Sequence, residues 1–535
     1  MTIRIINLTL GIDESKDLLD KKIAKKLKMS VDKVSDYKII KESLDARKRN
    51  DLKFTYAINI DLPNEKALVE KLKDRDILLE KEGYNADLVS CGTEKLEHRP
   101  VVVGMGPAGL FAALLLARKG YKPLVFERGE DVDARTATVD KFWETGVLDK
   151  ESNVQFGEGG AGTFSDGKLT TRIKDNRCDF VLEALVKHGS PEDIIYKGKP
   201  HVGTDILKGV VKNIREEIKS LGGEVYFRSR VENITKENGK VTGVIVNGKE
   251  FKTNNVIFAI GHSSRDTYKM LYDNEVFMTA KPFAIGVRAE HPQKGINETQ
   301  YGEKYATHPK LGAAEYRLTY QAKELGRAVY SFCMCPGGVV VNAASEEGRL
   351  CVNGMSYHAR DKENANSALV VTVGPEDYGS DHPLAGMEFQ RKYEELAFKV
   401  GGSNYKIPVQ LVGDFMEGRV TTELRSVTPS VAPNHVFRDL RECLPDYVVE
   451  AIKEAVPDFE RKIEGFGHPD SVLTGIETRT SAPVTLKRDE RLQSISIEGL
   501  YPAGEGAGFA GGIISAAVDG IKVAEKIVEK YAPLV

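Results

Sequence analysis

A glycine-rich stretch early in the sequence has the spacing of a site that binds a pyrophosphate. Gly104, Gly106 and Gly109 form the pattern G-x-G-x-x-G, directly after three valines at positions 101–103. In such a turn the first glycine allows the bend, the second lets the backbone approach a pyrophosphate, and the third lets the next helix pack on the strand. Pro107 suits a first helical turn, because the N–H that it lacks would have no partner there. This spacing predicts dinucleotide binding at a helix N-terminus.

The residues that follow complete the unit. Residues 110–119 predict an apolar helix, and residues 123–126 predict a second strand that ends in Glu127 and Arg128. An acidic residue about 20 positions after the glycines can bind ribose hydroxyls. The alternative is a glycine-rich turn in another kind of α/β unit, but strand, glycines, helix, second strand and Glu127 occur in the expected order.

Two later glycine-rich segments predict further contacts with the same cofactor. Residues 155–169 contain four glycines in six positions, which can surround a ligand with backbone N–H groups. The alternative is a flexible surface loop. Residues 499–512 predict a strand and a tight turn before a final helix, and this second helix N-terminus suits a cofactor longer than NAD, with the first site taking the ADP half of FAD. The predicted cofactor-binding residues are Gly104, Gly106, Pro107, Ala108, Gly109, Glu127, Arg128, Gly159, Gly160, Gly162, Thr163, Gly261, Gly504, Glu505, Gly506, Gly511, Gly512 and Ile513.

Three side chains are the predicted catalytic groups. His262 follows a predicted cofactor-side strand and can act as acid or base, although a structural hydrogen bond explains it equally well. Arg479 can stabilise negative charge that develops as a hydride moves. Cys335 can donate a proton. With Cys333 it can also form a redox pair, although a disulfide between cysteines so close in sequence is strained and pocket-lining thiols are the simpler interpretation.

Other candidates are weaker. Arg265 and His358 can also bind an anionic or carbonyl group, but a structural role explains each of them better. No group of His, Cys, Asp or Glu has the spacing of a metal site, so no metal is expected.

The elements that must position these residues divide the chain into three predicted domains. Residues 1–97 form a small α+β domain, with strands at 3–10, 37–40 and 54–62 and helices at 15–28 and 65–72, in an order that suggests a ferredoxin-like fold. Residues 98–265 and 475–535 form a Rossmann-like FAD-binding domain. Residues 266–474 form an inserted β-rich substrate domain without a G-x-G-x-x-G of its own. The fold class is therefore α/β.

Composition excludes several classes of protein. The chain has 535 residues, 41% of them hydrophobic, and a net charge of −3, so nothing overall points to nucleic acid or an anionic membrane. Lysines cluster in residues 21–28, which suggests an RNA or partner surface, but acidic residues nearly balance them and a solvated helix face is the preferred interpretation. The N-terminus becomes charged too early for a signal peptide. Six scattered cysteines favour a cytoplasmic location.

Seven motifs give the sequence a family resemblance. VVVGMGPAGL, FGEGGAGTFSDGKL, PHVGTDIL, FAIGHSSRDT, CMCPGG, ETRTSAPV and YPAGEGAGFAGGIISAA occur in order over residues 90–535. In these the chain resembles the FAD-utilizing dehydrogenase family, which has a glutathione-reductase-like FAD-binding fold. The resemblance implies FAD and redox chemistry but no substrate. Glu505 departs from the Asp common at this point of related flavoproteins, and it can still bind a ribityl hydroxyl.

These observations predict an FAD-dependent oxidoreductase. The expected activity is that of a dehydrogenase or reductase, which moves a hydride between flavin N5 and a small organic substrate. NADH or NADPH as a transient electron donor and a redox partner protein stay open, and neither a membrane nor a nucleic acid is expected. The alternatives are a flavin monooxygenase, an RNA-modifying or RNA-binding flavoprotein that uses residues 1–97, and a module that holds FAD as structure or sensor.

Overall fold

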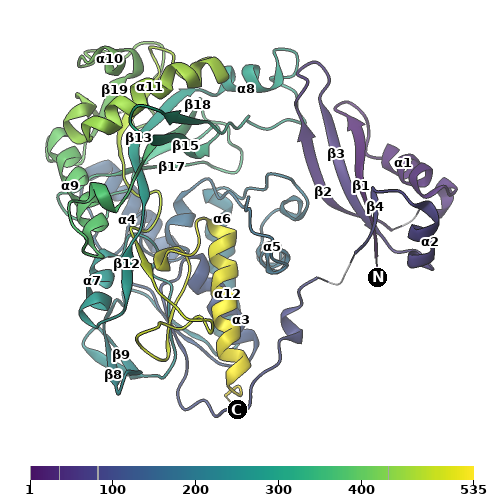
Figure 1. Cartoon of the computed structure of the whole chain (residues 1–535), viewed down its shortest axis with the longest axis horizontal. Helices are drawn as coiled ribbons and strands as arrows, with labels where there is room; N and C mark the ends of the chain where they lie inside the picture. Colours follow the sequence, from purple (N-terminus) through teal and green to yellow (C-terminus); the bar gives the residue numbers. More distant parts are fainter. Residues whose placement is uncertain (1, 35, 81–82, 432, 535) are drawn as a thin grey trace.

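Three large sheets of different topology organise the molecule. The computed structural model describes residues 2–34, 36–80, 83–431 and 433–534. A four-stranded sheet forms an N-terminal unit, a five-stranded parallel sheet forms a second unit, and a seven-stranded sheet forms a third (Figure 1). None of the helices in the described residues has the length and apolar character needed to cross a bilayer.

The N-terminal unit has the βαββαβ order of a ferredoxin-like fold. Its elements are β1 (Thr2–Gly11), α1 (Leu18–Leu27), β2 (Lys38–Asp45), β3 (Lys53–Ile60), α2 (Glu65–Leu72) and β4 (Ile77–Glu80). The sheet order is β2-β3-β1-β4 and every pairing is antiparallel. Leu19, Ile23 and Leu27 recur at helical spacing on α1 and are buried against the sheet. The ferredoxin-like prediction is confirmed, and β4 is a strand that the sequence pattern did not indicate.

The segment that joins this unit to the rest of the chain corrects the predicted boundary at residue 97. Ala86 and Leu96 are buried in the same apolar core as the last helix of the chain. The Tyr84 hydroxyl donates to Glu525 at 2.7 Å, and a Cβ on Gly92 would lie 2.2 Å from the backbone of Lys530. Residues 84–97 therefore pack on the cofactor domain rather than on the four-stranded sheet.

The parallel sheet carries the predicted cofactor domain. Its strands are β5 (Val101–Val103), β6 (Leu124–Phe126), β7 (Glu224–Tyr226), β11 (Val256–Phe258) and β23 (Leu500–Pro502), in the order β23-β11-β5-β6-β7. The helices are α3 (Pro107–Arg118), α4 (Val132–Thr145), α5 (Arg177–Lys187), α6 (Thr204–Ser220), α7 (Arg265–Asp273) and α12 (Ile513–Lys530). A hairpin sheet contains β8 (Val231–Glu237), β9 (Lys240–Val246) and β10 (Lys249–Lys252). The central strands are apolar along their whole length because both faces are covered, one by α3, α5, α6 and α12 and the other by the hairpin sheet and α7.

Thr204 begins a helix without capping it. It is the first residue of α6, and Gly203 with φ +85° occupies the capping position. The Thr204 hydroxyl instead donates to the carbonyl of Thr163. Thr204 thus ties α6 to the glycine-rich segment at residues 155–169.

The inserted unit is built on a mixed sheet. Its strands are β13 (Phe283–Pro292), β14 (Thr319–Ala322), β15 (Arg327–Cys335), β18 (Asn364–Val373), β19 (Ile407–Leu411), β20 (His435–Phe437) and β21 (Val472–Glu477), in the order β14-β15-β18-β13-β21-β19-β20. Two small sheets pair β12 (Met278–Ala280) with β22 (Val484–Leu486) and β16 (Val339–Asn342) with β17 (Val352–Met355). The helices are α8 (Gln293–Tyr301), α9 (Ala385–Val400), α10 (Val412–Glu417) and α11 (Asp446–Lys462).

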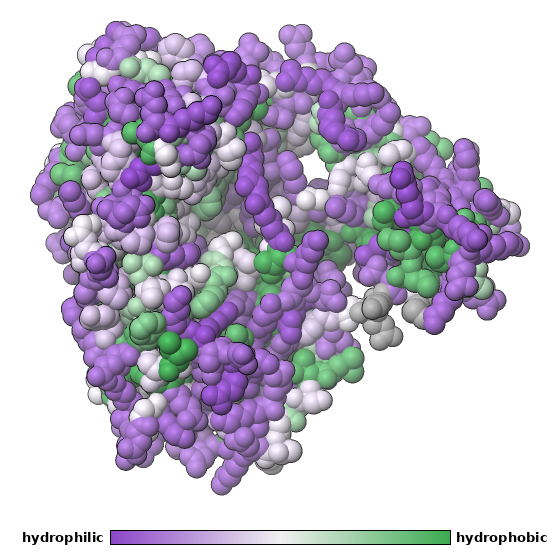
Figure 2. All heavy atoms as spheres, in the orientation of Figure 1, coloured by the Kyte–Doolittle hydropathy of each residue, from purple (hydrophilic) through white to green (hydrophobic). Residues whose placement is uncertain are grey.

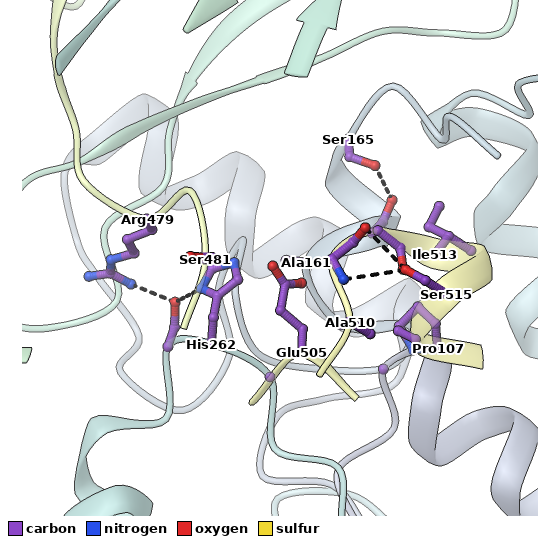
Figure 3. Close-up of a pocket in the computed structure, with 18 of the residues that line it drawn as sticks. Pro107, Ala161, Ser165, His262, Arg479, Ser481, Glu505, Ala510, Ile513 and Ser515 are labelled. Atoms are coloured by element: carbon purple, nitrogen blue, oxygen red, sulfur yellow. Dashed lines mark hydrogen bonds between the residues drawn. The ribbon is translucent and has the colours of Figure 1, made fainter. Parts of the chain in front are cut away.

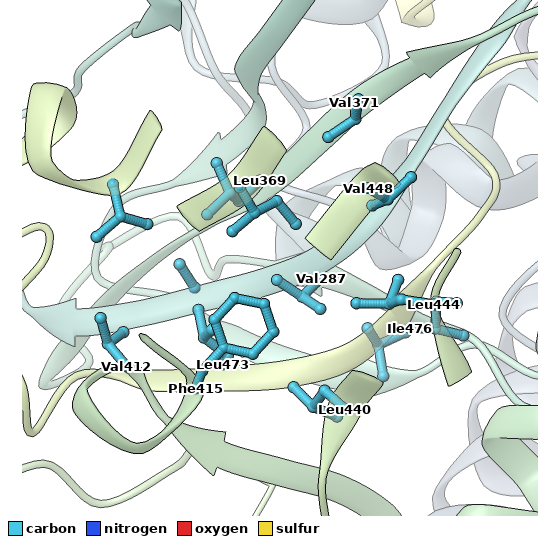
Figure 4. Packing of buried hydrophobic residues seen from close by; sticks show 14 of the residues in the cluster. Val287, Leu369, Val371, Val412, Phe415, Leu440, Leu444, Val448, Leu473 and Ile476 are labelled. Carbon is cyan, nitrogen blue, oxygen red and sulfur yellow. The ribbon is translucent and has the colours of Figure 1, made fainter. Parts of the chain in front are cut away.

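The core of this unit lies between the sheet and its covering helices. Val287, Leu369 and Leu473 project from three strands toward Phe415 and Val448 on two helices (Figure 4). The predicted boundary at residue 474 falls inside β21, whose whole length pairs with β13 or β19. The chain therefore returns to the cofactor domain after Glu477, three residues later than the sequence predicted.

Candidate cofactor and active site

A cavity of about 1430 Å³ lies between the parallel sheet and the inserted sheet. One wall comes from the turns after β5, β6, β11 and β23, and the other comes from the strands of the inserted unit. The space-filling view shows this face of the molecule hollowed between these two units and the N-terminal unit (Figure 2). Ligands of open parallel sheets bind outside the carboxyl ends of the strands, which is the position of this cavity.

The turn after β5 distinguishes the roles of its three glycines. Gly104 has φ +93°, and a Cβ there would lie 2.4 Å from the carbonyl oxygen of Ala259. A Cβ on Gly109 would lie 1.9 Å from the carbonyl oxygen of Gly104. A Cβ on Gly106 would meet only the Cα of Gly160, at 3.7 Å. The protein backbone itself requires the first and third glycines, whereas the second leaves open space on the cavity wall for a pyrophosphate.

Glu127 lies at the centre of three cofactor-side turns. One carboxylate oxygen accepts the N–H of Met105 at 2.8 Å, and the other accepts the N–H groups of Gly129 and Gly157, each at 2.9 Å. Its side chain is buried and borders the cavity. Glu127 therefore fixes the first glycine-rich turn and the second glycine-rich segment relative to each other. Its predicted contact with a ribose stays a prediction.

A buried arginine that sequence reasoning missed orders the segment at residues 155–169. Arg135 of α4 is fully buried and donates to the carbonyls of Asn153, Val154, Glu158 and Gly160 at 2.7–3.0 Å. Burial lowers the pKa of Arg135 to about 10, which keeps it charged at neutral pH. A segment whose carbonyls converge on one cation is not a flexible surface loop, so that alternative is excluded.

The predicted cofactor-binding residues divide into two groups. Those that line the cavity are Gly104, Gly106, Pro107, Ala108, Glu127, Arg128, Gly160, Gly162, Gly261, Glu505, Gly511, Gly512 and Ile513. The others fix the backbone behind the wall and are Gly109, Gly159, Thr163, Gly504 and Gly506. For example, a Cβ on Gly506 would lie 2.5 Å from the carbonyl oxygen of Gly261.

Arg479 is a fixed cation on the cavity wall. Its guanidinium donates two bonds to Glu394, at 3.0 and 2.9 Å, and a third to the Ser345 hydroxyl at 2.6 Å. Glu394 is fully buried and also pairs with Arg265 at 2.6 Å. Arg265 is only 1% exposed and does not reach the cavity, so its proposed contact with a ligand is wrong. Arg265 also pairs with Glu346 at 2.6 Å, so Arg479 belongs to a cluster of paired arginines and glutamates beside the cavity.

His262 lies on the same wall but is uncharged. Its Nδ1 is 2.8 Å from the Ser263 hydroxyl, which in turn accepts a bond from Arg479 (Figure 3). Burial and the charges of Arg479 and Arg265 lower the pKa of His262 to about 3. A neutral imidazole has no readily lost proton at physiological pH, so this charge state favours a hydrogen-bonding role over the predicted acid role.

The prediction of Cys335 as a cavity proton donor is wrong. Cys335 is fully buried and does not line the cavity, whereas Cys333, two residues earlier, is exposed to it. His358 also lies elsewhere, stacked on His201 with 5.2 Å between ring centroids. His262 and Arg479 both line the cavity, together with Ser165 of the second glycine-rich segment.

Lys281 and Glu505 both line the cavity, and the charge of each acts on the ionisation of the other. The sequence did not indicate that these two residues lie in one site. Glu505 projects into the middle of the cavity from the last glycine-rich turn (Figure 3). Burial raises the pKa of Glu505 to about 7, and the charge of Lys281 opposes this shift. Burial also lowers the pKa of Lys281 below its ordinary value. Nothing in the sequence around Lys281 distinguishes it from a surface lysine.

Comparison with known proteins agrees with this geometry. Residues 98–281 match the family model described as pyridine nucleotide-disulphide oxidoreductase, and residues 282–480 match the one described as FAD-dependent protein, C-terminal domain-like. Residues 2–61 match a domain of unknown function. An uncharacterized protein from Clostridium beijerinckii is 64% identical over 531 residues, which is 99% of each chain.

The chain belongs to the FAD-dependent oxidoreductase family. FAD is its cofactor, and the open space at Gly106 between two helix N-termini fits the dinucleotide. The flavoprotein is also 27% identical to protein FixC of Salmonella typhimurium over 193 residues, 35% of this chain and 42% of FixC. Among solved structures, L-amino acid deaminase from Proteus vulgaris is 12% identical, with a TM-score of 0.34 over 85% of this chain and 97% of that one.

Glu505 is expected to impose an ionisation near pH 7 on flavin reduction. Below that pH its carboxyl is neutral, and above it a carboxylate would place negative charge in the cavity that holds the flavin, which gains electrons on reduction. We expect anaerobic flavin reduction to slow roughly tenfold as pH rises through 7, the effect of about 1.4 kcal/mol. Stopped-flow absorbance measures the rate of flavin reduction. The decrease in this rate near pH 7 should be absent in Glu505→Gln. An unchanged profile in that variant would contradict the assignment.

Two further measurements sharpen this prediction. Lys281→Met removes the opposing charge, so the step should move to higher pH. The folded pKa of Glu505 lies above its ordinary value of 4.5. Its contribution to stability is therefore complete below pH 4.5 and is lost as pH rises through 7. Thermal denaturation of wild type and Glu505→Gln against pH would report that difference.

Proposed function

We propose that the protein is a reductase or dehydrogenase that moves a hydride between FAD and a small organic substrate. Bound FAD supplies the hydride donor or acceptor. The observation that supports substrate binding is the size of the cavity, 1430 Å³, which exceeds the range of about 300–1,000 Å³ typical of a single ligand. The cofactor turns form one wall, and the other wall belongs to the inserted unit.

The inserted wall suits an apolar body with a negative or carbonyl group. Tyr330 and Phe332 of β15 present aromatic surface to the cavity. Lys168, Arg317 and Arg479 place cations around it. Arg479 is the best placed to stabilise negative charge on the substrate, because Glu394, Ser345 and Ser263 hold its guanidinium rigidly. This arrangement favours an unsaturated acid or carbonyl compound as substrate.

An anaerobic experiment tests the proposal. The purified flavoprotein is mixed with NADH or NADPH, then with a panel of α,β-unsaturated acids and carbonyl compounds, while flavin absorbance is followed. We expect one nicotinamide to bleach the flavin and at least one panel member to restore its colour without oxygen. If no organic compound restores the colour and oxygen does so rapidly with formation of a hydroxylated product, the protein is a monooxygenase instead.

An RNA-binding function has less support. Lys26 of the α1 lysine cluster forms ion pairs with Asp74 at 3.1 Å and Asp76 at 2.6 Å, so part of the cluster is neutralised. A solvated helix face remains the better interpretation of these residues. We also propose a cytoplasmic location, since the six cysteines, all within the described ranges, are free thiols.

A further inference from the structure

An irregularity in β15 separates two cysteines that a regular strand would place on one face. The pairing of β15 with β18 shifts register between Phe332 and Cys335. Cys333 sits in the shift with φ +43°, a left-handed conformation that is strained for a residue other than glycine. Such bulges re-aim side chains, and strained backbone occurs mostly at functional sites. As a result Cys333 lines the cavity, whereas Cys335 is buried in the inserted unit.

A single buried arginine binds both cysteines. Arg288 of β13 is fully buried, and its Nη2 donates to the Cys333 carbonyl at 2.5 Å and lies 3.5 Å from the Cys335 Sγ. Its other terminal nitrogen pairs with Glu477 at 2.6 Å. The Cys335 Sγ is 3.4 Å from the Cys333 carbonyl. The guanidinium thus contacts the Cys335 thiol and the backbone of Cys333, and a fixed cation beside a thiol favours its thiolate form.

The ionisation of the two thiols fits this arrangement. Coupling to Cys335, together with the charges of Arg288 and Lys168, lowers the pKa of Cys333 below its ordinary value. Its hydrogen-bonded pairing with Cys333, together with burial, raises the pKa of Cys335. The thiol that lines the cavity therefore ionises more readily than the buried one. By contrast, Cys351 and Cys443 are buried, and burial raises their pKa values to about 12.

We propose that Cys333 and Cys335 form a redox-active dithiol that exchanges two electrons with the flavin across the cavity. On oxidation both S–H bonds are lost and one Sγ–Sγ bond forms, releasing two electrons and two protons. FAD accepts the two electrons and one proton, and the second proton goes to solvent. In the reverse direction reduced flavin and one proton from solvent regenerate the two thiols. A disulfide between cysteines with a single residue between them is strained. It is therefore readily reduced, as such exchange requires.

This inference depends on FAD as the cofactor but not on the organic substrate. The cavity gives the thiol a route to the flavin, because Cys333 and Glu505 line the same space. Lys168 holds the adjoining backbone by donating to the Met334 carbonyl at 3.0 Å. The two cysteines would store two electrons in addition to those held by the flavin. Alternatively, they would pass electrons to a disulfide compound that enters the cavity.

Anaerobic reductive titration of the oxidised holoenzyme tests the proposal. We expect wild type to take up four electrons per FAD, and Cys333→Ser and Cys335→Ser to take up two. Cys91→Ser is the matched control, because Cys91 is also exposed but belongs to the segment that packs on α12, and it should still take up four. A wild-type protein that takes up only two electrons per FAD overturns the proposal.

A second readout requires neither flavin nor a variant that folds. Peptide 328–349, released by cleavage after Arg327 and Arg349, contains Cys333 and Cys335 and no other cysteine. The wild-type protein, stripped of FAD, is treated with diamide and then with a maleimide before digestion and mass spectrometry. We expect the peptide without label after oxidation and with two labels after reduction. Two labels under both conditions overturn the dithiol even if the protein reduces an organic substrate, so the two proposals fail separately.

Discussion

Gly106→Val is expected to give a folded protein that contains almost no FAD. Its Cβ would meet only the Cα of Gly160 at 3.7 Å, so the protein itself tolerates a side chain there. The added methyl groups would fill the space where the pyrophosphate approaches the backbone. Loss of two charge-assisted hydrogen bonds costs about 3 kcal/mol, which corresponds to at least about 100-fold weaker FAD binding. The ratio of flavin to protein absorbance after purification measures this loss.

Two other glycines provide controls for this experiment. Gly209→Val places the same side chain on an exposed position of α6 with nothing within 4 Å, and it should retain FAD. Gly109→Val puts a Cβ 1.9 Å from the Gly104 carbonyl, so it should damage the fold itself. Circular dichroism separates these outcomes. Wild-type flavin content in Gly106→Val would show that the pyrophosphate lies elsewhere.

Arg479→Ala is expected to keep FAD and to slow substrate-dependent reoxidation of the flavin about 10²- to 10³-fold. That is the usual loss when one preorganised donor to a developing negative charge is removed. The variant should still fold, because Glu394 retains its bonds to Arg265 at 2.6 and 2.8 Å. Arg479→Lys should recover only part of the rate, since a lysine lacks the fork that Glu394 binds. Stopped-flow reoxidation by the substrate found in the anaerobic panel measures the effect.

The matched control for Arg479 is Arg391. The guanidinium of Arg391 pairs with Glu346, which is also a partner of Arg265, but Arg391 does not line the cavity. Arg391→Ala removes a comparable ion pair and should leave the rate unchanged. A full rate in Arg479→Ala with FAD still bound would place the substrate over another part of the flavin and refute the assigned role.

The sequence was most informative where one turn must satisfy several local requirements. At Gly104, Gly106 and Gly109 the bend, the close approach and the helix packing each demand a glycine at a fixed spacing, so the motif identifies the cofactor. Arg135 offered no such signal, because its four carbonyl acceptors come from a segment about 20 residues away whose path depends on the cofactor fold.

The choice between the two cysteines shows a different limit. Side chains two residues apart in a strand face the same side, so Cys333 and Cys335 were equivalent candidates. The register shift in β15 breaks that equivalence, and a bulge depends on pairing with β18, which follows about 30 residues later. The domain boundary predicted at residue 97 was wrong for a similar reason, because Ala86 and Leu96 share a core with a helix from the opposite end of the sequence.

The position of β23 and α12 sets an order for synthesis. β23 pairs with β11, and α12 packs on α3, yet both leave the ribosome only after the inserted unit is complete. Until then β11 is an open sheet edge and the apolar face of α3 lies uncovered, the kind of surface through which nascent chains aggregate. The core of the inserted unit is continuous in sequence from β13 to β21, so this unit can fold before the cofactor domain has its last strand and helix. The complete cofactor site, which includes the turn between β23 and α12, therefore exists only after the whole chain has been made.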